Sequence, residues 1–161
     1  MSGISIISDD KLPSLRATEI LGREGEALAA RYLTDNGCRI VLTNFKVPVG
    51  RNSQGAQVTG EIDIIALDQE TLCFVEVKTR RSADFTPVIT AVDLRKQRQI
   101  TRTARVYRRI FRVFEMPYRF DVVTVLMPTS GEPKIELSQG FWDESKFRKR
   151  SWHREMWHDH I

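Results

Sequence analysis

Two apolar segments in the middle of the chain constrain the fold more than any other feature. Residues 61–67 and 72–80 both have strand character, and the four residues between them are few enough for a hairpin turn. One face of this hairpin is apolar throughout and carries Ile62, Ile64, Ala66, Cys73, Val75 and Val77. The other face is apolar near the turn and ionisable at its open end. Strands of this kind are covered on both sides, so the hairpin predicts the central sheet of an α/β fold.

The turn of this hairpin sets its register, and the register brings two carboxylates together. A two-residue turn at 69–70 places Asp63 opposite Glu76. In the same register, Glu61 lies opposite Lys78. Opposed residues in an antiparallel pair have Cβ atoms roughly 4.5 to 5.5 Å apart, and like charges there are destabilising. A divalent cation would compensate, since carboxylate oxygens and water suit Mg²⁺.

Lys78 is compatible with a catalytic or a structural interpretation. Its ammonium lies on the same face as Glu76, where it could orient or activate a water for attack on a phosphodiester. Alternatively, Lys78 forms salt bridges with Glu61 and Glu76, and Asp63 lies at a solvated strand end. A register shift of one residue would also move the two carboxylates to opposite faces. The spacing alone leaves these alternatives open.

Hydrophobic periodicity predicts the remaining elements. They are a helix capped by Thr18 and stopped at Asn36-Gly37, a strand at 38–47, the two hairpin strands, a helix from Asp93 to about Phe114, and strands at 119–127 and 134–137. The order is α-β-β-β-α-β-β, with a mixed central sheet flanked by helices. Residues 48–60 are rich in Gly, and we expect a mobile flap there rather than a packed element.

The hairpin also resembles a known nuclease motif. Gly60-Glu-Ile-Asp-Ile-Ile-Ala66, followed by Phe74-Val-Glu-Val-Lys-Thr-Arg80, is similar to the PD-(D/E)XK motif and, more narrowly, to the YraN family of bacterial proteins related to Holliday junction resolvases. Further similarities to that family lie at Gly22-Arg-Glu-Gly-Glu-Ala27, Lys96-Gln97 and Arg119-Phe-Asp-Val-Val123. The resemblance covers about residues 20–127 and implies a restriction-endonuclease-like core.

The resemblance also implies a set of site residues. These are Asp63, Glu76, the Val77 carbonyl and Glu26 as ligands of Mg²⁺ or Mn²⁺, Lys78 as the catalytic lysine, and Lys96 or Gln97 lining the site from the second helix. Two segments depart from the family pattern, because 44–60 is longer than usual and the part after Gly140 looks like an addition. We therefore expect a mobile extension at 1–14, an endonuclease-like domain at 15–139 and a basic and aromatic tail at 140–161.

The predicted second helix carries a stripe of arginines. They are Arg95, Arg98, Arg102, Arg105, Arg109 and Arg112, at spacings of three and four. The opposite side carries Ile100, Ala104, Tyr107, Phe111 and Phe114, and Lys96 lies near this apolar side, pointing towards the sheet. No acid between Leu94 and Phe114 can pair with the arginines, so they repel one another unless phosphate or solvent compensates. Nucleic-acid contact is the prediction, and a plain solvated face is the alternative.

The predicted tail mixes basic with aromatic side chains. The aromatic ones are Trp142, Phe147, Trp152 and Trp157. Such interleaving can bind single strands by stacking, although a helix that packs its tryptophans on the core is the favoured interpretation. His153, His158 and His160 offer no clean frame for a metal ion.

Composition adds a few limits. Lys and Arg outnumber Asp and Glu by 25 to 21, which mildly favours a polyanionic partner. The two cysteines, Cys38 and Cys73, lie in apolar runs and are expected to be buried thiols. No segment approaches the ~20 apolar residues of a membrane-spanning helix, and residues 1–11 do not resemble a signal peptide. A cytoplasmic protein without membrane contact is expected.

These observations predict a Mg²⁺-dependent nuclease, or a structure-selective nucleic-acid-binding protein, acting on branched or damaged DNA in a bacterial cytoplasm. One alternative is a non-catalytic nucleic-acid-binding adaptor that keeps the fold. Another is a protein-interaction module with structural carboxylates. The sequence does not decide between DNA and RNA, or whether two copies pair as a homodimer.

Overall fold

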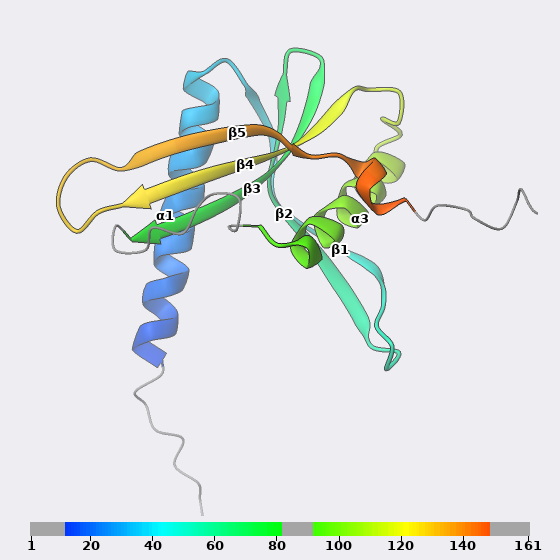
Figure 1. Cartoon of the computed structure of the whole chain (residues 1–161), viewed down its shortest axis with the longest axis horizontal. Coiled ribbons are helices and arrows are strands. Elements are labelled where there is room, and N and C mark those ends of the chain that lie inside the picture. Colours follow the sequence, from blue (N-terminus) through cyan, green and yellow to red (C-terminus); the bar gives the residue numbers. More distant parts are fainter. Residues whose placement is uncertain (1–11, 82–91, 149–161) are drawn as a thin grey trace, which may run out of the picture.

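The computed structural model describes residues 12–81 and 92–148 and consists of one sheet with two main helices (Figure 1). The elements are α1 (Leu12–Asp35), β1 (Arg39–Arg51), β2 (Gln57–Asp68), β3 (Thr71–Arg81), α3 (Leu94–Ile110), β4 (Tyr118–Met127), β5 (Lys134–Trp142) and the short 3-10 helix η2 (Glu144–Phe147). The strands lie in the order β1-β2-β3-β4-β5. Only β3 and β4 are parallel among these neighbours. The predicted α/β class and element order are therefore confirmed.

The central strand β3 is covered on both faces, as its apolar sequence predicts. Phe74 packs with Ile100 of α3 in one buried cluster. Val75 points the other way and packs with Ala29 and Leu33 of α1 in a second cluster. The two helices thus lie on opposite faces of the sheet.

The register predicted for the β2–β3 hairpin is confirmed from Asp68 opposite Thr71 to Ile64 opposite Val75. The prediction for Ile62 is wrong, because this side chain joins the cluster of Phe74 and not that of Val75. The alternation of β2 therefore changes at Asp63, where regular pairing with β3 has already stopped. A strand pattern read from sequence assumes unbroken alternation and misses such a change of face.

Residues 48–60 belong to a hairpin arm of β1 and β2, with one irregularity in the pairing between Pro48 and Gly50, and the predicted flap is wrong in this respect. β1 continues to Arg51 and β2 begins at Gln57. The side-chain oxygen of Asn52 accepts hydrogen bonds from the backbone N–H groups of Gln54 at 3.0 Å and Ala56 at 2.9 Å. Gly55 has a φ of 79° in this turn. The Asn and Gly residues that suggested a loop are thus the ones that close a tight turn between two strands.

Both long helices differ from their predicted ends. α1 begins at Leu12, so Thr18 lies within it and is not its cap. Asp93 caps α3 as predicted, by accepting from the Lys96 N–H at 2.8 Å. α3 ends at Ile110, before the predicted Phe114. Its end is closed by Arg112 at a φ of 54° and by the Val113 N–H, which donates to the Arg108 carbonyl.

The chain beyond the predicted boundary at 139 still belongs to the sheet. β5 continues to Trp142, whose buried ring stacks on Phe120 with the centroids 4.8 Å apart. Trp142 therefore packs on the core as favoured, although from a strand and not from a helix. Residues 1–11 of the predicted extension, and Trp152, Trp157 and the three histidines of the tail, lie outside the described residues.

Burial also accounts for the two cysteines. Cys38 and Cys73 are free and buried. Burial raises the pKa of Cys73 to about 12, so its thiol stays protonated at neutral pH. The prediction of small hydrophobic core residues is confirmed.

Two glycines three residues apart in α1 predict opposite mutational effects. A Cβ at Gly25 would overlap the side chain of Thr79 on β3, whereas a Cβ at Gly22 would meet nothing within 4 Å. Gly25→Ala should therefore destabilise the protein by about 1 to 3 kcal/mol through overpacking. Gly22→Ala should stabilise it by about 0.5 to 1 kcal/mol, because Ala favours helices. Urea unfolding of both variants is the measurement, and equal effects of the two would contradict the close packing of α1 on β3.

Candidate active site

The two predicted metal-binding carboxylates meet where β2 and β3 separate. Asp63 and Glu76 are buried, with exposed fractions of 9% and 4%. The last regular pair between the strands is Ile64 with Val75. Beyond it, the Val77 N–H donates a hydrogen bond of 2.8 Å to Asp63 Oδ2. A side chain thus replaces a strand-to-strand hydrogen bond, which holds the Asp63 carboxylate against the backbone of β3.

Two lysines approach the same oxygen of Glu76. Its Oε1 atom lies 3.5 Å from Lys78 Nζ and 3.9 Å from Lys96 Nζ. Lys96 therefore points from α3 towards the sheet, as its position on the helix predicts. The other oxygen, Oε2, is buried and accepts no hydrogen bond within the described part of the chain. An unpartnered buried carboxylate oxygen is costly and rare in proteins.

The charges around Glu76 are unbalanced. Burial, followed by the charge of Asp63, raises the pKa of Glu76 to about 8, although Lys96 and Lys78 act in the opposite direction. The two lysines therefore do not fully offset the burial of two adjacent carboxylates. Further positive charge next to Glu76 Oε2 would do so, and the residues present fit a divalent cation with oxygen ligands.

Glu26 reaches the same region from α1. It borders a depression of about 250 Å³ that is also lined by Asn44 and Asp63. Burial, and then the charges of Asp63 and Glu61, raise the pKa of Glu26, whereas a hydrogen bond with Asn44 lowers it. Three carboxylates thus influence one another across α1 and β2. Asn44 was not predicted from the sequence as a site residue. The one local indication is its residue type, because Asn tolerates a positive φ, and the φ of Asn44 is 53°.

Glu61 and Gln97 have other partners in the structure than the sequence predicted. Glu61 lies 3.8 Å from Lys46, across the β1–β2 pair, and its predicted pairing with Lys78 is not formed. The Gln97 amide donates to the Val92 carbonyl at 2.9 Å and accepts from Lys146 at 3.2 Å. Gln97 is thus engaged within its own helix end and with η2.

The described side chains do not form a complete set of metal ligands. Within residues 12–81 and 92–148, no group of three or more His, Cys, Asp or Glu side chains gathers closely enough to hold a metal ion. Asp63 and Glu76 would therefore supply two carboxylates, and the remaining ligands would come from backbone and water. Mg²⁺ commonly keeps several waters and takes one or two carboxylates.

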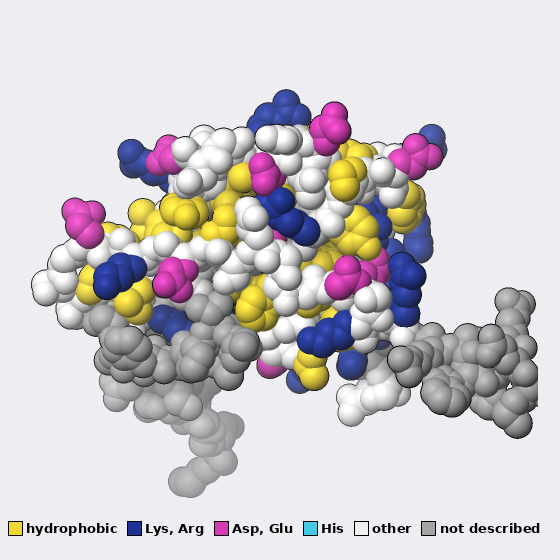
Figure 2. Space-filling model, turned by 45° about the horizontal axis from the view of Figure 1, so that its top comes forward, with side chains coloured by type: hydrophobic (Ala, Val, Ile, Leu, Met, Phe, Trp, Pro, Cys, Tyr) yellow, Lys and Arg dark blue, Asp and Glu magenta, His cyan; other side chains and the backbone are white. Residues whose placement is uncertain are grey.

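The arginine stripe of α3 is divided between two roles. Arg105 binds Glu144 of η2 at 2.6 Å, so the prediction that no acid compensates the stripe is wrong for this residue. The acid comes from a distant part of the sequence, which a search within the helix misses. The other predicted arginines are exposed, with Arg95, Arg98, Arg102 and Arg109 on α3; Arg112 lies beyond the end of the helix, so its predicted place in the stripe is wrong. The face drawn in Figure 2 shows basic and acidic side chains interspersed, so the net positive charge does not gather there.

Glu144 is also the centre of a buried polar network that the sequence did not indicate. Arg108 donates to it at 3.0 Å, and the Tyr118 hydroxyl donates to the same oxygen, Oε2. The Arg108 guanidinium lies 3.9 Å from the centre of the Tyr118 ring. This network joins η2, α3 and β4.

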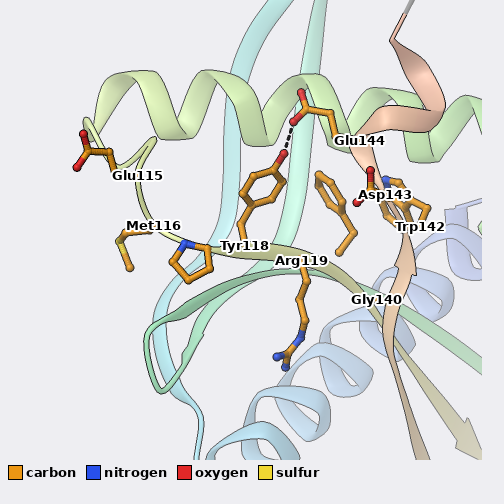
Figure 3. A pocket seen from close by; sticks show the side chains of 10 residues that line it. Glu115, Met116, Tyr118, Arg119, Gly140, Trp142, Asp143 and Glu144 are labelled. Atoms are coloured by element: carbon orange, nitrogen blue, oxygen red, sulfur yellow. Dashed lines mark hydrogen bonds between the residues drawn. The ribbon is translucent and has the colours of Figure 1, made fainter.

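Tyr118 and Glu144 also line a hollow of about 590 Å³ at the start of β4 (Figure 3). In this view, Tyr118 points towards Glu144, and Arg119 points away from it. Arg119 is bound by Asp121 and Asp68, both at 2.9 Å. Neither Asp63 nor Glu76 lines the hollow, and its Glu144 and Arg119 are already bound by charged residues outside the lining, so we do not assign the predicted chemistry to it.

The fold is an α/β domain with a mixed five-stranded sheet between α1 and α3, and Asp63, Glu76 and Lys78 lie close together where β2 and β3 separate. The family model "Uncharacterised protein family UPF0102" matches residues 25–125. A UPF0102 protein of Solibacter usitatus is 41% identical over 140 residues, covering 87% of this chain and 98% of that protein. A UPF0102 protein of Paenarthrobacter aurescens is 39% identical over 126 residues, covering 78% and 96%. The chain belongs to the UPF0102 family, and the predicted YraN family membership is confirmed.

None of the helices in the described ranges is long and apolar enough to cross a membrane.

Proposed function

We propose that this protein is a divalent-metal-dependent nuclease that hydrolyses phosphodiester bonds in branched or damaged DNA in the cytoplasm. The observation that carries the proposal is the buried Glu76 Oε2, which has no hydrogen-bond partner among residues 12–81 and 92–148 and belongs to a side chain adjacent to Asp63 and close to two lysines. Asp63 and Glu76 would bind Mg²⁺ or Mn²⁺, with the Val77 carbonyl as a further ligand and Glu26 nearby. When bound, the metal would stabilise the negative charge that develops on the phosphate.

The chain's own residues have distinct tasks in this proposal. The Asp63 carboxylate is fixed by the Val77 N–H, so its free oxygen has a defined direction. Lys78 is about one-third exposed, which lets its ammonium contact a phosphate or an attacking water while it remains near Glu76. Lys96 approaches from the opposite element and contributes a second positive charge. Charge placed in advance around a partly buried site costs no reorganisation during the reaction.

Cleavage of a labelled four-way DNA junction and of the matching duplex, with Mg²⁺ or Mn²⁺, tests this function. The parent should cleave only with metal. Asp63→Asn should lose at least about 100-fold in rate, because several kcal/mol of charge stabilisation disappear with the metal. Glu136→Gln is the matched control, since it removes an exposed carboxylate from β5 and should leave the rate unchanged. Cleavage that survives Asp63→Asn would rule out this site.

A non-catalytic nucleic-acid-binding adaptor is the second candidate. It is favoured by the two lysines at Glu76 Oε1, which already supply part of the charge that a metal would provide. An adaptor would bind the junction with equal affinity in the presence and absence of metal. It would also leave the junction intact under all conditions.

A further inference from the structure

A second concave site lies between α3 and η2, and its lining is basic. It has a volume of about 550 Å³ and is lined by Arg98, Thr101, Arg102, Arg105, Phe147 and Arg148. No carboxylate belongs to this lining. The volume falls in the range of pockets that hold small ligands, roughly 300 to 1,000 Å³. Four arginines around one hollow repel one another unless an anion occupies it.

Internal contacts account for only part of this positive charge. Arg105 is bound to Glu144, which fixes η2 against α3 and so shapes the pocket. The Arg98 guanidinium lies over the Phe147 ring, 5.6 Å from its centre. Arg102 and Arg148 form no ion pair within residues 12–81 and 92–148, although the charge of Arg148 helps to lower the pKa of the exposed Asp143. Both are exposed, so their guanidinium groups are available to a ligand.

The polar group at the back of the pocket is already satisfied. The Thr101 hydroxyl donates to the Gln97 carbonyl at 2.8 Å and accepts from the Trp142 indole at 2.9 Å. The recognition chemistry that remains consists of arginines, with one aromatic ring. Arginine binds phosphate oxygens through paired, charge-assisted hydrogen bonds. The pocket is therefore suited to a phosphate group.

The pocket and the candidate active site share one helix. Lys96, at the start of α3, reaches Glu76. With a rise of ~1.5 Å per residue, Arg98 begins about 3 Å and Arg102 about 9 Å further along the helix axis. Each strand of duplex DNA carries a phosphate every ~3.4 Å of its axis. Several phosphates of one strand therefore fit along this length of α3, but the helical period of 3.6 residues places both arginines on the side of the helix that faces away from Lys96.

We propose that Arg98, Arg102 and Arg148 form a phosphate-binding pocket that holds the nucleic-acid backbone on the side of α3 that faces away from Glu76. This inference rests on the proposed function for the identity of the ligand. The arginine stripe is then not a uniform interface, because Arg105 shapes the pocket, and Arg95 and Arg109 lie outside its lining.

The test compares two double variants with the same loss of charge. Arg102→Gln with Arg148→Gln removes two of the three pocket arginines that form no ion pair within the described residues. The control, Arg95→Gln with Arg109→Gln, removes two exposed arginines of the same helix. Binding to a short labelled DNA duplex is measured by fluorescence anisotropy over a series of salt concentrations, without metal so that cleavage does not interfere. Arg105 is kept, since its loss would also disturb Glu144.

The pocket variant should lower the log–log salt slope by about 1.8, which is two phosphate contacts at ~0.9 each. The control should lower it by clearly less. If the control lowers the salt slope by as much as the pocket variant or by more, the phosphate-binding pocket is ruled out, although the protein would still bind nucleic acid. Absence of duplex binding by the parent at low salt would overturn the pocket as well.

A second measurement shows whether the pocket binds the phosphates of nucleic acid or small phosphate compounds. It also distinguishes a failure of the pocket from a failure of the proposed nuclease activity. Inorganic phosphate and a nucleoside monophosphate are titrated into the parent and the pocket variant by calorimetry. Duplex binding that depends on the pocket, in a parent that never cleaves DNA, would uphold the pocket and contradict the nuclease. Binding of the small phosphates but not of duplex would show a small-molecule site and overturn the backbone assignment.

Discussion

Glu144→Gln is expected to destabilise the protein by about 3 to 5 kcal/mol. The side chains of Glu144 and Arg108 are only 9% and 7% exposed, so the variant leaves a buried guanidinium without its carboxylate. The expected cost is large because Arg105 and Tyr118 lose the same partner. Equilibrium unfolding in urea measures the effect. Glu136→Gln, which removes an exposed carboxylate from β5, should change the free energy of unfolding by less than about 0.5 kcal/mol.

The same carboxylate should make the fold sensitive to acid. Burial alone would raise the pKa of Glu144, but hydrogen bonds from Tyr118 and Arg105 and the charges of Arg108 and Arg105 together lower it. A lowered pKa in the folded state contributes stability that is present above the ordinary value of 4.5 and is lost as the pH falls through the folded value. Glu144→Gln should therefore lose less stability than the parent in this range. If the free energy of unfolding falls with pH in the same way for the parent and for Glu144→Gln, the Glu144 network does not cause the acid sensitivity.

A double variant shows whether the penalty comes from the unpaired charge. If Arg108→Met is added to Glu144→Gln, the buried guanidinium is removed as well. The double variant should then be more stable than the sum of the single effects, by about 0.5 to 3 kcal/mol. Strict additivity would mean that Glu144 stabilises η2 by some route other than Arg108.

The central part of the fold could be predicted because its signals are local. The two-residue turn between β2 and β3 fixes their register, and Asp63 and Glu76 come together just beyond the last regular pair. The helical spacing of α3 places Lys96 on the side that faces the sheet. Each of these predictions depends on residues close in sequence, where turn length and helical period leave few alternatives.

Features that depend on distant segments were missed for a common physical reason. Glu144 reaches Arg105 and Arg108 only because β5 and η2 return across the end of α3. Gly60 illustrates the same point in the supposed flap, since a Cβ there would overlap Thr103 of α3. A Gly that permits close packing and a Gly that breaks structure look alike in a sequence.

The second large effect is expected at Glu76 and separates a metal ligand from a structural carboxylate. Glu76→Gln should leave the metal-free protein at least as stable as the parent, because burial and the charge of Asp63 raise the pKa of Glu76 to about 8 and so favour an uncharged side chain at this position. The two lysines that contact Glu76 are about one-third exposed, so solvent can replace their lost partner. Denaturant titration at neutral pH, with chelator present, measures this effect.

Metal should then distinguish the two proteins. At about ten times its dissociation constant, Mg²⁺ or Mn²⁺ should stabilise the parent by about 1.4 kcal/mol, or a few degrees in Tm. Glu76→Gln should show no such shift and no metal-dependent cleavage, whereas Glu136→Gln should behave like the parent. If Glu76→Gln instead costs about 2 kcal/mol or more without metal, and the parent does not respond to metal, Glu76 serves as the buried partner of Lys78 and Lys96. The carboxylates would then be structural, and any binding of nucleic acid would have to be assigned to the arginines of α3.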